Sequence, residues 1–278
     1  MQPIALMMLE DDVRIELSTI IDAGKIIEVH PSVGVAQLKS RLTKSGAFAI
    51  IGAGPKKADF AREALLLRKH VLSDFPAGLT WSEVARLKQI SASKGVLFYS
   101  PNLLRFEAGI NELSQIVDRG ASKLLSVTIS CDLAGRGEQT QLLMKFAQII
   151  DLVEWLVGSK CVDVRQEKSH RVGSATARVV LMSHQNDVKT LLNLRCGASR
   201  NSSLWIDCIF NDSIVHVDPK SQSVRLVSSS NASHSEVNWT VQPLSKAIGA
   251  FKMMMRHGSG ESDFNSQRRL IQLTRELV

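Results

Sequence analysis

The first hundred residues alternate short apolar runs with amphipathic segments, and this alternation restricts the fold more than any other feature of the sequence. The apolar runs predict strands at 3–9, 25–29, 47–51, 70–72 and 96–99. Before the fourth run, Phe60, Ala61, Ala64 and Leu65 recur with the spacing of one helix face. Because strands that alternate with helices form βαβ units, we expect an α/β domain with a parallel sheet.

Two helices of this region have recognisable ends. A helix is predicted at 11–23, where Gly24 stops it. Thr80 and Glu83 have the spacing of a capping box, in which the hydroxyl accepts a free backbone N–H of the first turn. The helix that they begin is expected to stop near Gly95.

From residue 101 the pattern changes, which divides the chain into domains at 1–100 and 101–278. We expect helices at 106–119 and 139–156, with a strand at 124–131 between them. Further β-rich runs, separated by Asn, Ser and Gly turns, lie at 177–182, 190–194, 204–210 and 223–227. These runs predict a second α/β domain with a mostly antiparallel open sheet.

The composition is that of a folded protein, since 44% of the 278 residues are hydrophobic. No apolar run reaches the roughly 18 to 20 residues of a membrane span, and the first residues lack the features of a secretory signal. We therefore expect a cytoplasmic protein without membrane association. Cys131, Cys161, Cys196 and Cys208 include no CxxC pair, so we interpret them as reduced core thiols and expect no metal site.

The formal net charge of +7 hints at a polyanionic partner, but Lys and Arg look scattered along the chain and are seldom interleaved with aromatic residues. Nucleic-acid binding is therefore only a minor hypothesis, and the alternative is a solvated surface. The densest basic pairs are Lys56-Lys57, Arg68-Lys69 and Arg268-Arg269. We expect each pair on a solvated helix face.

Several segments, in this order, resemble the Gfo/Idh/MocA oxidoreductases, the family of glucose-fructose oxidoreductase and inositol dehydrogenase. Residues 58–72, ADFAREALLLRKHVL, resemble the family helix that leads into a Gly-Lys-His-Val-Leu strand. Residues 80–85, TWSEVA, are similar to the helix after the catalytic-lysine loop, and 101–130 to the segment that begins the second domain. Residues 151–158, DLVEWLVG, resemble the end of the helix that carries the catalytic histidine, and 243–278 the closing helices, which return to the first domain.

This resemblance implies a Rossmann-type first domain that binds NAD or NADP. It implies a second domain whose open sheet forms one wall of the substrate pocket and usually the dimer interface, so we expect a homo-oligomer through the C-terminal sheet. Function still has to be argued from the site itself.

The turn after the first strand lacks the residues that such a cofactor needs. Glycines normally let the backbone approach the pyrophosphate there, but this turn reads Leu9-Glu10-Asp11-Asp12. One like-charge contact at about 4 Å costs on the order of 4 kcal/mol at an effective dielectric of 20, whereas a helix dipole supplies about 0.3 to 1 kcal/mol. The acids are more simply explained as caps of their own helix.

The rest of the cofactor pocket is also incomplete. His30 stands near the position of the acidic residue that would bind the adenosine ribose. The chain from 31 to 47 is too short for the usual helix and strand, which suggests that one βα unit was deleted. Gly52 and Gly54 resemble a phosphate loop, but they fall where the family has a Thr-Pro-Asn turn, and Pro55 removes one N–H donor.

The proton relay of the family uses a lysine in a Glu-Lys-Pro string and an Asp and a His one helical turn apart. Aligning Asp74-Phe75-Pro76 with the first string puts Phe75 at the lysine position. Aligning 151–158 with the helix end puts Gln148 at the histidine and Met144 at the aspartate. None of these three shuttles a proton near neutral pH, and the loss of general acid–base help is worth roughly 10² to 10⁴ in rate.

The polar residues that remain fit a pocket without redox chemistry. The resemblance places them near the cleft between the domains, and they are Asp74, Pro76, Asn102, Arg105 and Asp151. Arg105 has the geometry to bind a carboxylate or phosphate, or it forms a structural ion pair with Asp74 or Asp151.

Two functions follow. The leading hypothesis is a family member that has lost cofactor binding and catalysis and acts as a ligand sensor, a regulatory protein or the silent partner subunit of a catalytic chain. The alternative is an active, divergent NAD(P)-dependent oxidoreductase that acts on a sugar, polyol, imine or enone.

Overall fold

The computed structural model describes most of the chain, and the descriptions below refer to residues 3–8, 26–30, 32, 34–52, 54, 56–75, 79–118, 123–134, 139–172, 175–199, 203–219, 223–228, 232–236, 243–257 and 269–270. The chain forms two compact units, Met1–Phe106 with Val241–Arg268 and Glu107–Thr240 with Arg269–Val278. The helix predicted at 11–23 lies outside the described residues, as does nearly all of 258–278, the second part of the segment that resembles the closing helices.

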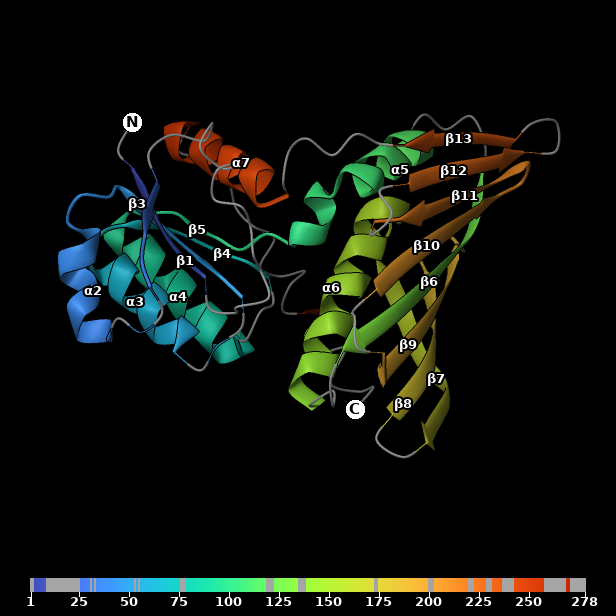
Figure 1. The fold of residues 1–278 in the computed structure, drawn as a ribbon, viewed down its shortest axis with the longest axis horizontal. Helices are drawn as coiled ribbons and strands as arrows, with labels where there is room; N and C mark the ends of the chain where they lie inside the picture. Colours follow the sequence, from blue (N-terminus) through green and yellow to red (C-terminus); the bar gives the residue numbers. More distant parts are fainter. Residues whose placement is uncertain are drawn as a thin grey trace. The chain divides into compact units, whose positions relative to one another are not determined.

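The first unit contains a five-stranded parallel sheet (Figure 1). Its strands are β1 (Ile4–Met8), β2 (Ile26–Glu28), β3 (Ala47–Ile51), β4 (His70–Ser73) and β5 (Phe98–Tyr99). Their order is β2-β1-β3-β4-β5, with Ile4 paired to both Ile26 and Ala47. This is the doubly wound order 3-2-1-4-5-6 with the third strand removed, which agrees with the deletion of one βα unit that the sequence suggested.

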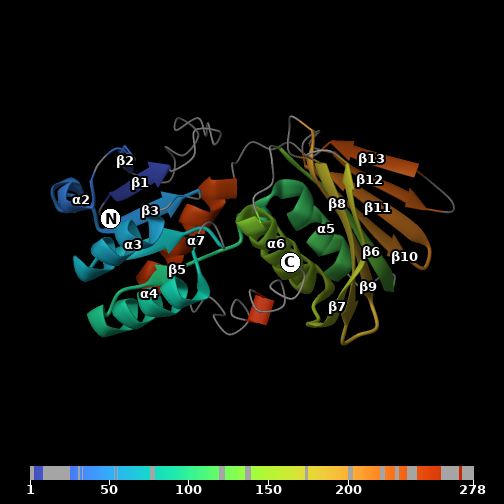
Figure 2. The same cartoon turned by 90° about the horizontal axis from the view of Figure 1, so that it is seen from below.

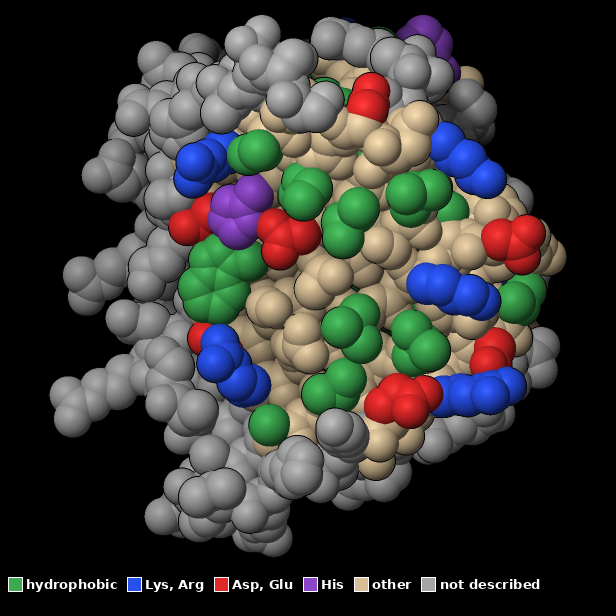
Figure 3. All heavy atoms as spheres, turned by 90° about the vertical axis from the view of Figure 1, so that its right-hand side faces the viewer, with side chains coloured by type: hydrophobic (Ala, Val, Ile, Leu, Met, Phe, Trp, Pro, Cys, Tyr) green, Lys and Arg blue, Asp and Glu red, His purple; other side chains and the backbone are tan. Residues whose placement is uncertain are grey.

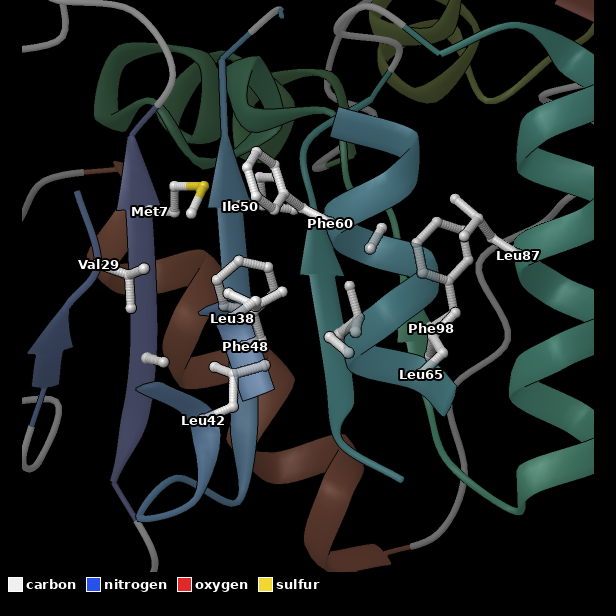
Figure 4. Packing of buried hydrophobic residues seen from close by; sticks show 14 of the residues in the cluster. Met7, Val29, Leu38, Leu42, Phe48, Ile50, Phe60, Leu65, Leu87 and Phe98 are labelled. Atoms are coloured by element: carbon white, nitrogen blue, oxygen red, sulfur yellow. The ribbon is translucent and has the colours of Figure 1, made fainter. Parts of the chain in front are cut away.

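Helices cover both faces of this sheet. The helices α2 (Val35–Leu42), α3 (Lys57–Leu66) and α4 (Trp81–Lys94) bury apolar residues against one face, where Ala5, Met7, Phe48 and Ile50 point (Figure 4). Helix α7 (Pro243–His257) packs Leu244, Ile248 and Phe251 against the other face, which carries Ile4, Leu6 and Ala49. Successive strand residues therefore enter different cores, as expected for a parallel sheet that is buried on both sides.

The predicted capping box is present at the start of α4. The Thr80 hydroxyl oxygen accepts the Glu83 N–H at 3.3 Å, and the Glu83 carboxylate accepts the Thr80 N–H at 2.6 Å. Gly95 ends the helix with φ +64°, a left-handed conformation that costs a residue without a Cβ little. A short 3-10 helix, η2 (Leu103–Phe106), follows β5, and the helix predicted at 106–119 is α5 (Ala108–Asp118).

The second unit contains an eight-stranded sheet in the order β13-β12-β11-β10-β6-β9-β8-β7. The strands are β6 (Leu124–Ala134), β7 (Cys161–Val172), β8 (Ala175–His184), β9 (Lys189–Ser199), β10 (Ser203–Phe210), β11 (Ser213–Asp218), β12 (Ser223–Ser228) and β13 (Ala232–Glu236). All neighbours are antiparallel except β6 and β9. Helices α5 (Ala108–Asp118) and α6 (Gln139–Val157) lie on the same face of this sheet (Figures 1 and 2).

The structure bears on two expectations drawn from composition, the state of the cysteines and the presence of a membrane span. Cys131, Cys161 and Cys208 are buried free thiols, as predicted. Burial raises the pKa of the Cys161 thiol to about 11, so it is a core residue and not a nucleophile. Among the described helices, none is long and apolar enough to cross a membrane.

The capping box gives a stability prediction. We expect Thr80→Ala to lower the free energy of unfolding by about 1 kcal/mol, because the backbone N–H of Glu83 loses its acceptor. Urea denaturation followed by circular dichroism measures this change. Ser93→Ala on the same helix is the control, since the Ser93 hydroxyl only donates to the Ile90 carbonyl and caps nothing. Equal effects of the two substitutions would contradict a capping role for Thr80.

Candidate functional site

The polar residues of the first unit gather where β3, β4 and β5 end. Gly52 directly follows β3, Asp74 follows β4, and Ser100 and Asn102 follow β5. Asp74, Ser100 and Asn102 are all buried. Ligands of open α/β sheets bind at the carboxyl ends of the strands, so this edge is the candidate site.

A buried ion pair is the central feature of this edge. The Lys57 ammonium, at the start of α3, donates to the Asp74 carboxylate with an Nζ–Oδ1 distance of 2.6 Å. The same carboxylate oxygen accepts the Gly52 N–H at 3.2 Å. Lys57 also lies 3.4 Å from the Asp74 carbonyl oxygen. Lys57 therefore joins the turn after β3 and the start of α3 to the end of β4.

The two charges of this pair have little access to water. The Lys57 side chain is 0% exposed and that of Asp74 is 9% exposed. Burial raises the pKa of the Asp74 carboxyl, while the Lys57 ammonium and the Gly52 N–H both oppose this shift. Each group depends on the other, because removal of either leaves a charge or a polar group buried without its partner.

The prediction that the basic pairs lie on solvated helix faces is therefore wrong for Lys57. It is also wrong for Lys69, whose ammonium donates to the Ser45 carbonyl at 2.5 Å, and for Arg269, which bonds to Glu154 and to the Cys161 carbonyl. Lys56 and Arg68 are exposed, as expected. Arg268 lies outside the described residues. Lys56 and Lys57 differ because Lys56 is the N-cap outside α3, whereas Lys57 begins the helix on its buried face.

Phe75 occupies the position that aligns with the family lysine, and it is a core residue. Its side chain is 1% exposed, and its N–H donates to the Pro101 carbonyl at 2.8 Å. This bond brings the segment after β4 beside the segment after β5, so Asn102 lies near the same edge. The Asn102 amide oxygen accepts the Leu104 N–H at 3.2 Å and so shapes the start of η2. Pro76 lies outside the described residues.

Tyr99, the only tyrosine of the chain, ends β5 with its ring stacked on Phe251 at a centroid distance of 6.2 Å. Burial raises the pKa of its hydroxyl, and the Arg105 guanidinium opposes that shift. Arg105 follows in η2. The Asp74 carboxylate pairs with Lys57. The expected ion pair of Arg105 with Asp74 or Asp151 stays a prediction.

The residues expected at the cofactor turns have local roles where they are described. The ring of His30, which is exposed, bonds to the hydroxyl and the N–H of Ser32. Gly52 has φ +90°, and its N–H donates to the Asp74 carboxylate. The Gly54 carbonyl accepts the Lys57 N–H. Leu9, Glu10, Asp11 and Asp12 lie outside the described residues.

The relay positions of the second unit lie along α6. Met144, Gln148 and Asp151 have the spacing of one helix face, i, i+4 and i+7. Asp151 is buried, and the Gln148 amide oxygen lies 3.5 Å from the Lys145 ammonium. The structure thus groups the predicted site residues by unit, with Asp74, Phe75, Asn102 and Arg105 in the first and this α6 face in the second.

The described polar groups at this edge are bonded within the chain. A phosphate needs free backbone N–H groups or free cations, but the Gly52 N–H and the Lys57 ammonium are both bonded to Asp74. A carbinol needs a proton acceptor, and the aligned position holds the buried Phe75 ring. No three described His, Cys, Asp or Glu residues are arranged to hold a metal ion.

Sequence reasoning missed Lys57, the residue that organises this edge. One signal was present in the helical spacing, because Lys57, Phe60, Ala61 and Ala64 share the inward face of α3. A lysine on an apolar helix face is rarely buried unless a carboxylate pairs with it. Asp74, at the end of the next strand, was the candidate for that carboxylate.

Solved structures match the chain over nearly all of its length. A dehydrogenase from Chromobacterium violaceum superposes with a TM-score of 0.82 at 12% identity, covering 99% of this chain and 94% of that one. UDP-N-acetylglucosamine 3-dehydrogenase GnnA from Acidithiobacillus ferrooxidans gives 0.77 at 15%, covering 99% and 96%. A Gfo/Idh/MocA family oxidoreductase from Vibrio cholerae gives 0.72 at 16%, covering 100% and 97%. At these identities the likeness shows the fold.

No protein-family profile matches the sequence. No curated protein matches it either.

The ion pair gives a prediction for the site. We expect Lys57→Met to destabilise the protein by about 3 to 5 kcal/mol, because Asp74 loses the cation that compensates its burial. Lys57→Met combined with Asp74→Leu should restore most of the loss, since neither charge then remains. Chemical denaturation measures both variants, and Lys56→Met is the exposed neighbouring control, expected within about 0.5 kcal/mol of wild type. A double variant no more stable than Lys57→Met would show that the pair is not coupled.

Proposed function

We propose that this chain, which has the fold of the Gfo/Idh/MocA oxidoreductases, has lost hydride transfer and acts as a ligand-sensing, regulatory or partner subunit. The fold is the one that the sequence resemblance predicted. The proposal concerns what the chain does with it.

The observation that carries this proposal is that the described polar groups at the carboxyl edge form hydrogen bonds with one another. Lys57, Asp74 and the Gly52 N–H bond to one another within the protein, and the Phe75 ring is buried beside them. Binding a pyrophosphate at these groups requires breaking a buried ion pair, which leaves Asp74 without its cation. The edge therefore disfavours binding of the cofactor, independently of the hydride-transfer reaction.

The sequence before α2 adds an electrostatic obstacle. Residues 1–33 contain six acidic and two basic side chains, and three of the acids are Glu10, Asp11 and Asp12, after the first strand. A doubly charged pyrophosphate close to that turn meets repulsion that a helix dipole does not offset.

The rival function is a working, divergent NAD(P)-dependent oxidoreductase acting on a sugar, polyol, imine or enone. One observation favours it, because Lys57 places an ammonium at the edge of the sheet where the family lysine is missing. For this role Lys57 would have to leave Asp74 and reach solvent, and its side chain is 0% exposed.

Cofactor titration separates the two functions. We expect no saturable heat on titrating NADH or NADPH to about 1 mM, the upper end of ordinary KM values. We also expect native mass spectrometry of the protein as isolated to show no bound dinucleotide. The control is cooperative unfolding of the same sample, which shows that the protein is folded. A Kd in the micromolar range for either cofactor would overturn the proposal and favour the oxidoreductase.

We also propose that the chain forms a homo-oligomer through the open face of the second sheet. This face lies opposite α5 and α6 and carries three exposed apolar side chains, Leu191 at 36%, Ile214 at 44% and Val227 at 39%. Ile214 pairs with Val227 on β12 and with Ile209 on β10. Figure 3 looks onto this face, where apolar side chains lie across the middle and charged ones are more frequent toward the margins. Such a patch supports contact between copies.

Charged substitutions on this face test the oligomer. Wild type is expected to have about twice the 30.6 kDa mass of one chain in multi-angle light scattering. Leu191→Lys with Ile214→Lys should give the single-chain mass, because two ammonium groups would be buried without partners. Leu66→Lys is the control, since Leu66 is 44% exposed on α3 in the first unit. A wild-type monomer at micromolar concentration would remove the proposal.

A further inference from the structure

The positive charge of this protein is concentrated in one part of the chain. Residues 34–95 contain eleven Lys and Arg against four Asp and Glu, which is a net charge of +7. The whole chain also has a net charge of +7, so all other residues together are neutral. This segment contains α2, α3 and α4, the helices that cover one face of the first sheet.

The fold brings this excess to one surface. Helix α3 packs between α2 and α4, so the three helices form a single layer (Figure 1). Lys57 and Asp74 cancel in the interior, which leaves ten basic and three acidic side chains for the layer. We call its six exposed basic residues the basic helical layer: Lys39, Arg41, Lys44, Lys56, Arg68 and Arg86.

These six side chains are available to a partner. Within the described part of the chain, none of them forms an ion pair or a side-chain hydrogen bond. The acids nearby have roles of their own in two cases, since Asp59 pairs with Arg62 at 3.2 Å and Glu83 closes the capping box with Thr80. Glu63, half-buried on α3, is the remaining acid.

We propose that the basic helical layer binds the phosphate backbone of a nucleic-acid duplex without reading its sequence. Three of the six residues lie on α2 and α4, and Lys44, Lys56 and Arg68 flank the ends of α2 and α3. Six exposed basic residues on adjacent helices and at their ends make a surface that attracts a polyanion. Packed helix axes lie about 8 to 10 Å apart, so the layer extends over about 20 Å. A duplex carries one charge per about 1.7 Å, so a length of this order presents on the order of ten phosphate charges.

The composition of the layer favours this partner over an acidic protein or a membrane. Protein interfaces are depleted in lysine and centred on apolar or aromatic residues, whereas the basic helical layer contains three lysines. Leu66 is the one large hydrophobic residue of α2, α3 and α4 known to be exposed, which leaves little to insert into a lipid surface. Among the side chains described on α2, α3 and α4, no aromatic ring is exposed for a base to stack on. The expected contacts are therefore to phosphates.

The sequence alone argued against nucleic acid because its basic residues look scattered along the chain. Lys39, Lys56 and Arg86 are far apart in sequence but belong to neighbouring helices. This inference does not depend on whether the chain binds a dinucleotide, since Gly52, Lys57 and Asp74 are not part of the layer and only Lys56 lies beside them.

Fluorescence anisotropy with a labelled 20-base-pair DNA duplex of random sequence, and with an RNA duplex of the same length, tests the proposal. At physiological salt we expect a Kd of about 1 to 100 µM, the range of non-specific binding, and equal affinity for an unrelated sequence. The logarithm of the association constant should fall with the logarithm of the salt concentration with a slope of about −5.

The variant Arg41→Gln, Lys56→Gln, Arg86→Gln removes three charges of the layer, one on α2, one at the N-cap of α3 and one on α4. We expect at least tenfold weaker binding and a slope reduced by about 3. The control removes the same charge from the second unit, with Lys123→Gln, Lys160→Gln and Arg165→Gln, and should bind like wild type. Thermal unfolding of both variants shows that they are folded.

Three results would overturn the proposal. The first is no binding of either duplex at 50 mM salt with 100 µM protein. The second is equal weakening in the two charge variants, which would mean that net charge and not the basic helical layer determines affinity. The third is tighter binding to poly-L-glutamate, or to vesicles with phosphatidylserine, than to the duplexes, which would assign the layer to an acidic protein or to a membrane.

Discussion

The buried ammonium of Lys57 has to be matched by a carboxylate, and Asp74 supplies it from the end of the neighbouring strand. The pair also takes up the Gly52 N–H, so one carboxylate oxygen connects the turn after β3, the start of α3 and the end of β4. A buried ion pair seldom adds net stability, but breaking it is costly. This contact therefore holds together the described residues after β3 and β4.

This constraint connects the fold to the function proposed for it. A parallel sheet leaves polar backbone groups at its carboxyl edge, and in dinucleotide-binding domains a phosphate takes up several of them. Here a lysine and an aspartate of the chain itself do so at β3 and β4. The Phe75 ring, 1% exposed, fills a neighbouring position with apolar volume. These described groups therefore bond to one another in a chain that has the fold of an oxidoreductase.

Much of the fold was predictable, and the failures have common causes. Strand β3 has the predicted bounds. Helix α4 begins at the Thr80 capping box and stops at Gly95 as expected, because these signals act within a few residues. Strand β13 was not predicted from the Ser-rich stretch at 228–235, since its extended form comes from pairing with β12. At the candidate site, Asp74 and Phe75 were identified from alignment with a motif, but Lys57 was assigned to a solvated face.

The sequence by itself determined the alternation of strands and helices and the two ends of α4. Each of these depends on residue type and short-range spacing alone. Only the tertiary structure decided that Lys57 is buried while Lys56 is exposed, and that basic residues of α2, α3 and α4 share one surface. The energy of a charge depends on the dielectric and the charges around it, and segments distant in sequence supply both.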